Sequence, residues 1–579
     1  MPTSDPVIVI DSEWGYTDRR IGCESAFMPV VLCAQVLGGE CHVFWARDRH
    51  RLAEFLVRYR DAYWVAHSAT AEMKYLLRVG LQPPEKWWDT MVGYRVAANR
   101  SGYLSAALVD ALGASGLADL IPPNKNEMRE AILNLQFAPE DEPAIAEYCM
   151  ADVRATAALY ARLVDRLDPA TMQHWCEYLR AVARMELRGI PIDTAALVRI
   201  WNGREHIAEA LRDKLNRTAR VYRHDGTFDC GAFFGWLRAQ KIAWPQSLGK
   251  NGWYDPLDDD TLEAMEKRHP FIEELRQTRK SLRSIMDHVM LVDGVTRRHY
   301  YSTMPFRSVT GRNQPSQFIF SGPKWLRWLI TPASPDHVLV YADFAAEEIG
   351  IAAALSGDEA MQSMYAADDP HLAFAVRAGA APATATKDTH GDIRDQYKTV
   401  NLAVLYAQTP YGIADRLGID LYESKLLLRQ HESLFRKYHE WSKRVVATAV
   451  QRRTIHTRCG WKAHVEPGTK WRTWANFPVQ AGAADVMRVM TLVLDRQNVQ
   501  ILAIVHDGWL LSCRKGQLEQ LRAAVGHARR VTCDTLLNGF QLKLDIAVYR
   551  DCFEDKKGKK AWDFIRSVLP RELPEIEPA

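Results

Sequence analysis

The sequence predicts a mixed protein of α/β and α+β units that is divided into several domains. Its 579 residues are too many for one hydrophobic core, because a domain usually holds about 100–200 residues, and about three to five units are expected. Apolar runs typical of buried strands end at acidic residues in three places: Val7–Ile10 runs into Asp11, and two later runs stop at Asp343 and at Asp507. Helix-like segments lie between these strands.

The composition is that of a soluble globular protein, with 47% hydrophobic and 25% charged residues. The net charge of +3 does not by itself indicate a nucleic-acid partner. Basic residues nevertheless gather between Leu275 and Ile330, where ten Lys or Arg stand against two acids, Asp287 and Asp293. This segment is either a phosphate-binding surface or a solvated basic face. The segment alone supports these two interpretations equally. Together with the catalytic motifs described below, it favours phosphate contact.

The ten cysteines include no Cys-x-x-Cys pair and no zinc-type spacing, which is typical of reduced thiols in a cytoplasmic protein. The N-terminal residues MPTSDPVIVIDSEW do not resemble a signal peptide, and no uninterrupted apolar stretch approaches the length of a membrane span. We therefore expect a cytoplasmic protein with no membrane partner.

Acidic residues near the first predicted strands form one candidate site. Asp11 and Glu13 point to the same side of a strand, and like charges so close repel unless a cation lies between them. Glu72 lies in the first turn of a predicted helix, where compensation of the helix dipole is the common alternative role. Tyr148 and Asp152 share one face of a later helix at i, i+4 spacing.

In this order, these residues resemble the proofreading 3′→5′ exonuclease superfamily, whose domain is RNase H-like. The resemblance implies that Tyr148 orients the attacking water and that four carboxylates hold two metal ions, namely Asp11, Glu13, Glu72 and Asp152. Glu72 departs from the usual aspartate, which keeps the charge but moves the carboxylate. Asp89 also matches the family, but it is interpreted as a turn or cap residue.

A second candidate site comes from the strands that end at Asp343 and Asp507. If they lie side by side, their carboxylates reach a pair of divalent ions about 3.5–4 Å apart, the geometry that suits in-line displacement at phosphorus. Between them, the segment RDQYKTVNLAVLY places four residues on one helical face: Arg394, Lys398, Leu402 and Tyr406. The alternative is a cationic amphipathic helix whose last two of these residues belong to the core.

The order of acidic strand, cationic helix and acidic strand resembles the polymerase core of family A DNA polymerases, a right hand of palm, fingers and thumb. The resemblance implies that Asp343, Phe344 through its backbone, and Asp507 bind two Mg²⁺ ions per active site, for which Mn²⁺ can substitute. Lys398 would protonate the leaving group, and Glu348 would exclude a 2′-hydroxyl from the sugar. The residues expected at the incoming dNTP are Arg394, Lys398, Leu402, Tyr406, Glu348 and His506.

The resemblance implies contacts with DNA at three further places. Thr310–Gln317 is a compressed form of the Thr-Gly-Arg motif, with Arg312 at the primer terminus or minor groove. Arg472, Asn476 and Gln480 follow at i, i+4 and i+8 and would check the shape of base pairs in the minor groove. A predicted thumb helix carries four cations that either meet phosphates or form a solvated face: Arg276, Arg279, Lys280 and Arg283.

Three positions depart from the polymerase pattern. Leu402 stands where an aromatic residue is usual, Ala407 stands for a glycine, and Gly508 replaces the glutamate of a His-Asp-Glu motif. Gly508 is also expected to be a turn residue between its two strands. The lysine cluster at Asp555–Lys560 is expected to be solvated or to brush DNA.

The expected domains are an exonuclease domain at 1–165, a linker and thumb at 166–300, a palm at 301–345 and 455–579, and fingers at 346–454. A linker helix is expected at about 156–184, Gly189 should end a helix, and the Gly/Pro-rich segment 244–256 should interrupt the helices of the thumb.

The partners implied are primer-template DNA and dNTPs, with replication accessory proteins, and the protein is expected to be a monomer. The length leaves no room for the 5′-nuclease domain that bacterial DNA polymerase I carries in front. This favours a phage-type replicative enzyme in the cytoplasm of a bacterium or a phage-infected host cell.

Two other functions stay open. One is a nuclease whose polymerase half has become a DNA-binding module, which the departures at Gly508, Leu402 and the Thr310 segment suggest. The other is a replication scaffold in which both sites are inactive. Against both, the acids, cations and tyrosine of the polymerase motifs are all retained.

Overall fold

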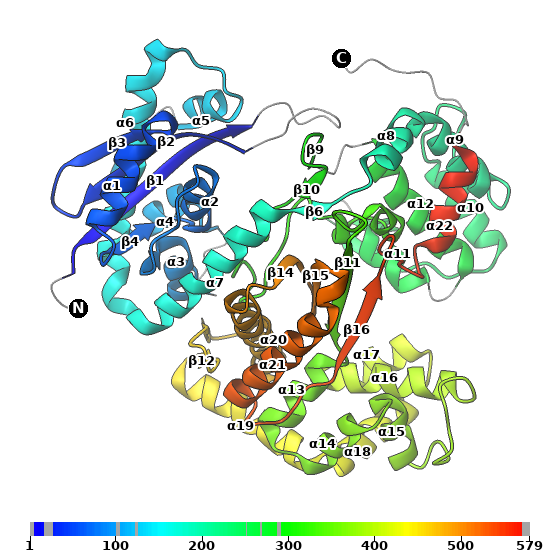
Figure 1. Cartoon of the computed structure of the whole chain (residues 1–579). Coiled ribbons are helices and arrows are strands. Elements are labelled where there is room, and N and C mark those ends of the chain that lie inside the picture. Colours follow the sequence, from blue (N-terminus) through cyan, green and yellow to red (C-terminus); the bar gives the residue numbers. More distant parts are fainter. Residues whose placement is uncertain are drawn as a thin grey trace.

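Two separate β-sheets organise the chain in this computed structural model, which describes residues 5–16, 27–99, 105–121, 125–249, 252–266, 269–286 and 291–569. Figure 1 shows one sheet near the N-terminus, in blue, and a second that combines strands from distant parts of the sequence. Helices surround both sheets, which confirms the expected mixture of α/β and α+β organisation.

The N-terminal sheet has the strand order β3-β2-β1-β4-β5, with β1 antiparallel to β2 and parallel to β4. Its strands are β1 (Val7–Tyr16), β2 (Phe27–Val36), β3 (Cys41–Trp45), β4 (Tyr63–Ala66) and β5 (Trp87–Asp89). Its helices are α1 (Arg49–Arg58), α2 (Thr70–Arg78), α3 (Thr90–Ala98), α4 (Leu108–Ala114), α5 (Lys125–Leu133) and α6 (Glu142–Leu163). Ile8, Val9 and Ile10 are fully buried, because α2 and α6 both pack against β1. The predicted strand thus continues through Asp11 and Glu13.

The helix α7 (Pro169–Arg188) joins this unit to the rest of the chain. It packs against α2 and β5 of the N-terminal unit and against α20 and β14 of the second sheet's layer (Figure 1). The helical linker expected at 156–184 consists of two helices, because α6 ends at Leu163 and a new helix begins after Asp168. Asp168 accepts from the Thr171 N–H at 2.8 Å and so caps α7. The helix ends at Gly189, as predicted, where φ is 63°.

The second sheet is antiparallel, with the order β14-β15-β11-β16. Its strands are β11 (His337–Phe344), β14 (Gln500–Val505), β15 (Gly508–Arg514) and β16 (Leu544–Tyr549). The helices α20 (Trp471–Arg496) and α21 (Leu518–Leu536) pack together beside it. Among the described residues, α20 is the one helix long and apolar enough to cross a membrane, but 78% of its apolar window is buried inside the protein. It therefore serves here as a core helix.

A block of helices follows β11 and lies at the bottom of Figure 1. It consists of α13 (Glu347–Ser356), α14 (Glu359–Ala366), α15 (Pro370–Arg377), α16 (Gly391–Leu405), α17 (Pro410–Leu417), α18 (Leu421–Leu434) and α19 (Arg436–Arg452). The hairpin of β12 (Thr454–His456) and β13 (Lys462–His464) leads from this block into α20.

A further group of helices has its own small core, which contains Leu215, Phe233, Ile272 and Leu275. Its helices are α8 (Thr194–Asn202), α9 (Arg204–Asn216), α10 (Cys230–Ala239), α11 (Asp259–Glu266) and α12 (Pro270–Met286). The predicted interruption contains the strands β7 (Ser247–Gly249) and β8 (Gly252–Tyr254). Three short strands form a separate sheet in the order β6-β10-β9, namely β6 (Ile190–Pro191), β9 (Leu291–Asp293) and β10 (Arg298–Tyr300).

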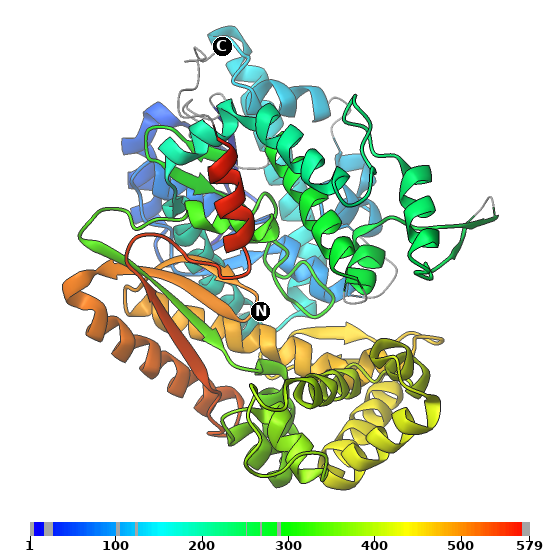
Figure 2. The ribbon, with the colours of Figure 1, turned by 90° about the vertical axis from the view of Figure 1, so that its right-hand side faces the viewer.

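The C-terminal helix α22 (Lys559–Val568) belongs with these helices rather than with the second sheet. It packs against α9 and against the short helix at 324–329, and Figure 2 shows it in red beside the green helices. The helix at the C-terminal end of 455–579 thus contacts both α9 and the 324–329 helix, which lies within the expected palm range 301–345.

Several basic residues of the segment beginning at Leu275 are engaged in internal ion pairs. Arg276 is 7% exposed and contacts Asp259, Glu263 and Glu266, so its expected phosphate contact is wrong. Lys280 also pairs with Asp259, at 3.0 Å. Carboxylate partners likewise hold Arg312 and Arg327.

We expect Arg276→Ala to lower the free energy of unfolding by about 2 kcal/mol, because it leaves three acids of α11 without their shared cation. Lys280→Ala, which removes a half-exposed pair, should cost less than about 1 kcal/mol. Urea denaturation of both variants checks the difference. Equal losses would show that Arg276 is not the centre of this cluster.

Candidate functional site

The two predicted aspartates meet at one rim of the second sheet. Asp343 is the penultimate residue of β11 and pairs with Gly508 of β15, while Asp507 lies in the turn just before Gly508. The Phe344 N–H donates to the Asp507 carbonyl at 3.0 Å, which fixes the turn beside the strand. Burial, followed by the charge of Asp507, raises the pKa of Asp343 from 3.8 to about 7. Two crowded carboxylate groups are a donor set that fits hard divalent cations such as Mg²⁺.

The turn that carries Asp507 is strained. β14 and β15 are joined by the two-residue turn His506-Asp507, and His506 has a φ of 52°, in the left-handed region that favours glycine. Such strain is retained where the surrounding structure or function requires it. Here it brings His506 and Asp507 to the wall of a cavity.

A cavity of about 640 Å³ opens beside this rim. Its walls include nearly all of the side chains expected at the dNTP, together with Arg312: Arg394, Lys398, Leu402, Tyr406, Glu348, His506 and Arg312. The structure therefore brings together residues that lie more than 190 positions apart in the sequence, such as Arg312 and His506.

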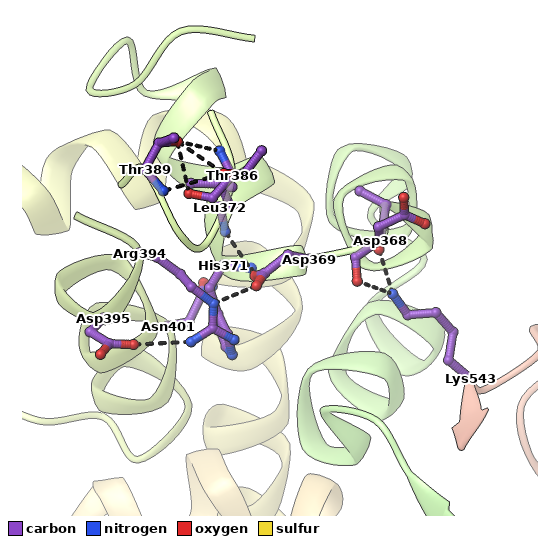
Figure 3. A network of polar contacts seen from close by, with 11 residues as sticks. Asp368, Asp369, His371, Leu372, Thr386, Thr389, Arg394, Asp395, Asn401 and Lys543 are labelled. Carbon is purple, nitrogen blue, oxygen red and sulfur yellow. Dashed lines mark hydrogen bonds and ion pairs between the residues drawn. The ribbon is translucent and has the colours of Figure 1, made fainter. Parts of the chain in front are cut away.

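The cationic face of α16 forms one wall of the cavity. Arg394 is not a free cation, because Asp369 and Asp395 both pair with it, the latter at 3.0 Å (Figure 3). Lys398 has no ion-pair partner among the described residues, and it is thus the available cation of this face. The sequence analysis missed Asp369, which caps α15 by accepting from the backbone of His371.

His371 is a second cavity residue that the sequence analysis missed. It lies two residues after Asp369, and its ring Nδ1 is 3.3 Å from the side-chain nitrogen of Asn401 on α16. Burial lowers the pKa of His371 from 6.5 to about 4, so the ring is neutral at pH 7. The Asp-Pro start of a helix could have marked this place in the sequence, but nothing local shows that it faces α16.

Glu348 links two parts of the cavity wall. Its Oε1 accepts from Arg312 at 2.8 Å and from the Tyr406 hydroxyl at 3.3 Å. Tyr406 also hydrogen-bonds with Gln480 of α20, and it marks the C-terminal end of α16. Glu348, predicted to contact the sugar, and Tyr406, predicted to contact the template side, thus bond to each other. Each also bonds to a residue predicted at the minor groove, Arg312 or Gln480.

The other residues expected at DNA lie on two helices. Asn476 of α20 is buried, and its Oδ1 has no hydrogen-bond partner among the residues that the structure describes. The Arg472 guanidinium lies 5.8 Å from the centre of the Trp471 ring. On α12, Arg279 lies 5.2 Å from the centre of the Phe228 ring. Their contacts with DNA stay predictions.

The N-terminal acids form a second cluster. Ligand atoms of Asp11, Glu13 and Cys149 lie within 4.8 Å of one another, so the strand acids meet α6. The same helix carries Tyr148 and Asp152, and the charges of Glu13, Asp152 and Asp11 add to burial in raising the pKa of Tyr148. Tyr148 and Asp152 of α6 thus lie beside Asp11 and Glu13 of β1, as the order of the motifs predicts. Cys149 was not foreseen.

Glu72 lies slightly apart from this cluster. It is in the first turn of α2, as predicted, and only 1% of its surface is exposed. Its Oε1 accepts from the Ser12 hydroxyl at 3.4 Å, and burial raises its pKa well above 4.5. Asp89, interpreted as a cap, does accept from the Val92 N–H at the start of α3 and from the Ala69 N–H.

Residues 238–548 match the family model described as DNA polymerase family A, which covers more than half of the chain. The chain belongs to DNA polymerase family A. The resemblance inferred from the strands at Asp343 and Asp507 is thereby confirmed.

Relatives of this family A chain include DNA polymerase I of Chloroflexus aurantiacus, which is 24% identical over 86% of this chain and 56% of its own length. DNA polymerase I of Geobacillus stearothermophilus is 23% identical over 66% of this chain and 46% of its own length. The chain thus spans about half the length of these two relatives. DNA polymerase I of Aquifex aeolicus is 22% identical over 84% of this chain and 87% of its own length.

A solved structure of similar fold is the polymerase domain of Pol1 from M. smegmatis, in complex with DNA primer-template and dNTP. It has a TM-score of 0.71 and 18% identity, and the match covers 94% of this chain and 95% of that one. This likeness supports a family A polymerase fold.

Gly508 is required by close packing rather than by the turn. It is the first residue of β15, outside the two-residue turn, and its φ is not positive, so its expected role as a turn residue is wrong. A Cβ at this position would lie 2.5 Å from Asp343 Oδ1 and 2.8 Å from the Ala342 carbonyl oxygen. The glutamate expected here therefore has no room in this chain.

Ala407 is a departure of the opposite kind, because its φ is 48°. The glycine that the resemblance implies would adopt this left-handed conformation without strain, whereas an alanine costs about 1 kcal/mol there. The chain keeps the backbone geometry after Tyr406 in spite of this cost.

We expect Gly508→Ala to destabilise the protein by about 1–3 kcal/mol, because the new methyl group overlaps Asp343 and the backbone of β11. Thermal unfolding measures the loss. Gly516→Ala is the matched control, since a Cβ there meets nothing within 4 Å. If both variants unfold at the same temperature as the wild type, the contact between Gly508 and Asp343 is looser than described.

Proposed function

We propose that this chain is a DNA-directed DNA polymerase that extends a primer 3′ end along a template. The observation that carries the proposal is the pair of crowded carboxylates, Asp343 and Asp507, at the rim of the sheet, where Asp507 lines the same cavity as the cationic face of α16. Membership of family A and the likeness to a polymerase domain in complex with primer-template DNA and dNTP support it.

Each wall of the cavity has a distinct task in this reaction. Asp343 and Asp507 would hold two divalent cations, Mg²⁺ or Mn²⁺, which when bound activate the attacking oxygen and neutralise the leaving oxygens of an in-line displacement. Lys398 binds the triphosphate and donates a proton as pyrophosphate leaves. Arg394 is held by Asp369 in an orientation that presents its remaining N–H groups to anionic oxygens.

We assign the second sheet with α20 and α21 to the palm, α14–α19 to the fingers, and α8–α12 with α22 to the thumb. Helices α9–α12 share a small separate core, which supports treating them as a unit. In this assignment α12 and α20 face the duplex, with contacts from Arg279, Lys280 and Arg283 on the first and from Arg472, Asn476 and Gln480 on the second.

We also propose a 3′→5′ exonuclease in the N-terminal unit. Asp11, Glu13 and Asp152 would hold the cations of this site, and Tyr148 would orient water. The Glu72 carboxyl accepts a hydrogen bond from Ser12. Glu72 would therefore act on the cations by positioning Ser12, or would bind them itself after a small movement. A proofreading activity of this kind fits a replicative, phage-type enzyme that works in the cytoplasm as a monomer with accessory proteins.

Primer extension tests both assignments together. With Mg²⁺ and dNTPs, we expect the wild type to extend a 5′-labelled primer, and without dNTPs to shorten it. Asp343→Asn should lower extension by about 10³-fold, because each lost metal ligand removes several kcal/mol of charge stabilisation, and should leave shortening intact. Asp11→Asn should do the reverse.

The outcomes separate the alternatives. A wild type that only shortens the primer would make the polymerase half a binding module. One that only extends it would leave the N-terminal cluster without nuclease function, with Glu72 as the first residue to restore to aspartate. A wild type that does neither would favour a scaffold.

We expect Glu348→Ala to raise ribonucleotide incorporation by about 10–100-fold, because a methyl group leaves space for one more oxygen beside the sugar. Glu348→Gln keeps the volume and a hydrogen bond to Tyr406, so it should retain most of the discrimination. Single-turnover rates with matched rNTP and dNTP measure the ratio. An unchanged ratio in the alanine variant would remove Glu348 from sugar selection.

A further inference from the structure

Glu347 is a buried acid in the polymerase cavity that no proposed step uses. It is the first residue of α13, only 4% of its surface is exposed, and it lines the same cavity as Asp507 and Lys398. Within the part of the chain that the structure describes, its Oε1 has no hydrogen-bond partner. A buried carboxyl oxygen left unpaired costs free energy, so this one calls for an explanation.

The donors around Glu347 are engaged elsewhere. Arg312 pairs with the neighbouring Glu348 at 2.8 Å. Lys543, on the same cavity wall, donates its Nζ to the carbonyls of Ala367 and Asp368, the latter shown in Figure 3. The charge of Glu347 also reaches Tyr365, whose hydroxyl donates to the Ala345 carbonyl at 2.9 Å and accepts from the Lys543 N–H. Among the described residues, none of these donors bonds to Glu347 Oε1.

The charges that face Glu347 are mostly negative. Burial is the largest cause that raises the pKa of Glu347, and the charge of Asp507 is the next. Arg312 lowers this pKa, and the charges of Glu348 and Asp343 raise it further. The charges of three acids thus oppose ionisation of Glu347 and that of one arginine favours it, an arrangement that a bound divalent cation would stabilise.

Gly508 gives this acid a particular place in the site. Position 508, beside Asp343, admits no side chain, since even a Cβ there would lie 2.5 Å from the carboxylate oxygen. A third carboxylate of the site therefore has to come from a position other than 508. The left-handed residue Ala346, with φ of 51°, turns the chain directly after β11 and starts α13 with Glu347 at the cavity wall.

We propose that Glu347 is a third carboxylate of the polymerase centre, which adds an oxygen donor to the divalent cations held by Asp343 and Asp507. This inference rests on the proposed function for the identity of the cations, but it concerns cation binding itself. It is therefore testable without DNA or nucleotide.

The first experiment measures binding of Mn²⁺ to the full chain by electron paramagnetic resonance. Asp11→Asn with Glu13→Gln serves as the background, so that ions of the N-terminal cluster are not counted. In this background, we expect Glu347→Gln to weaken Mn²⁺ binding at the polymerase centre by about 10-fold. Asp507→Asn should weaken it further. Glu359→Gln is the matched control, because Glu359 is exposed and pairs with Lys437, and it should have no effect.

The second experiment compares thermal unfolding with and without Mn²⁺, in the same background. Without cations, Glu347→Gln should not lower the unfolding temperature, because the carboxyl oxygen that it replaces has no hydrogen-bond partner among the described residues. Addition of Mn²⁺ should raise the unfolding temperature less in the Glu347→Gln variant than in the background protein. A lower temperature without cations would identify a satisfied structural acid and overturn the proposal.

Two further results are decisive. If Glu347→Gln binds Mn²⁺ like the background while Asp507→Asn does not, Glu347 is no part of the centre. If the protein fails to extend primers but loses Mn²⁺ binding on substitution of Glu347, the inference stands and the proposed polymerase function fails. The two ideas can therefore be rejected independently.

Discussion

The register between β11 and β15 is the constraint on which the polymerase site depends. It sets Asp343 opposite Gly508, so that the carboxylate of Asp343 and the turn carrying Asp507 share one rim of the sheet. A slip by one residue would turn Asp343 to the opposite face and separate the pair. The strained φ of His506, the missing side chain at Gly508 and the raised pKa of Asp343 all follow from holding two carboxylates this close.

The parts of this arrangement that the sequence could predict are local. A strand that ends in an acid can be read from a run of ten residues, and so can a helix with a cation every fourth position. Asp343, Asp507 and Lys398 were found in this way; the structure places Asp507 and Lys398 on one cavity and Asp343 beside Asp507 at the rim of the sheet. Gly189 was found because a glycine before Ile-Pro ends a helix whatever packs against it.

The parts that the sequence could not predict depend on partners distant in the chain. Arg276 reads as a free cation of α12 until α11 folds against it and supplies three acids. Arg394 reads as unpaired until α15 brings Asp369. Gly508 reads as a turn residue, because nothing nearby in sequence shows that Asp343 occupies the space of its side chain. Charge pairing and close approach are properties of the fold, so a linear pattern records only one partner of each pair.

The helix α7 shows how the same principle joins the two candidate sites. Glu186, which is 4% exposed, accepts from the Lys74 ammonium of α2 at 2.8 Å and from the Thr303 N–H at 2.6 Å. Near the same end of the helix, Arg184 pairs with Asp495 of α20 at 2.5 Å. A buried acid that bonds to both units makes their separation costly, because either movement leaves a desolvated carboxylate without a donor. The N-terminal cluster and the polymerase rim are therefore held at a fixed spacing, and a primer end that used both would have to travel between them.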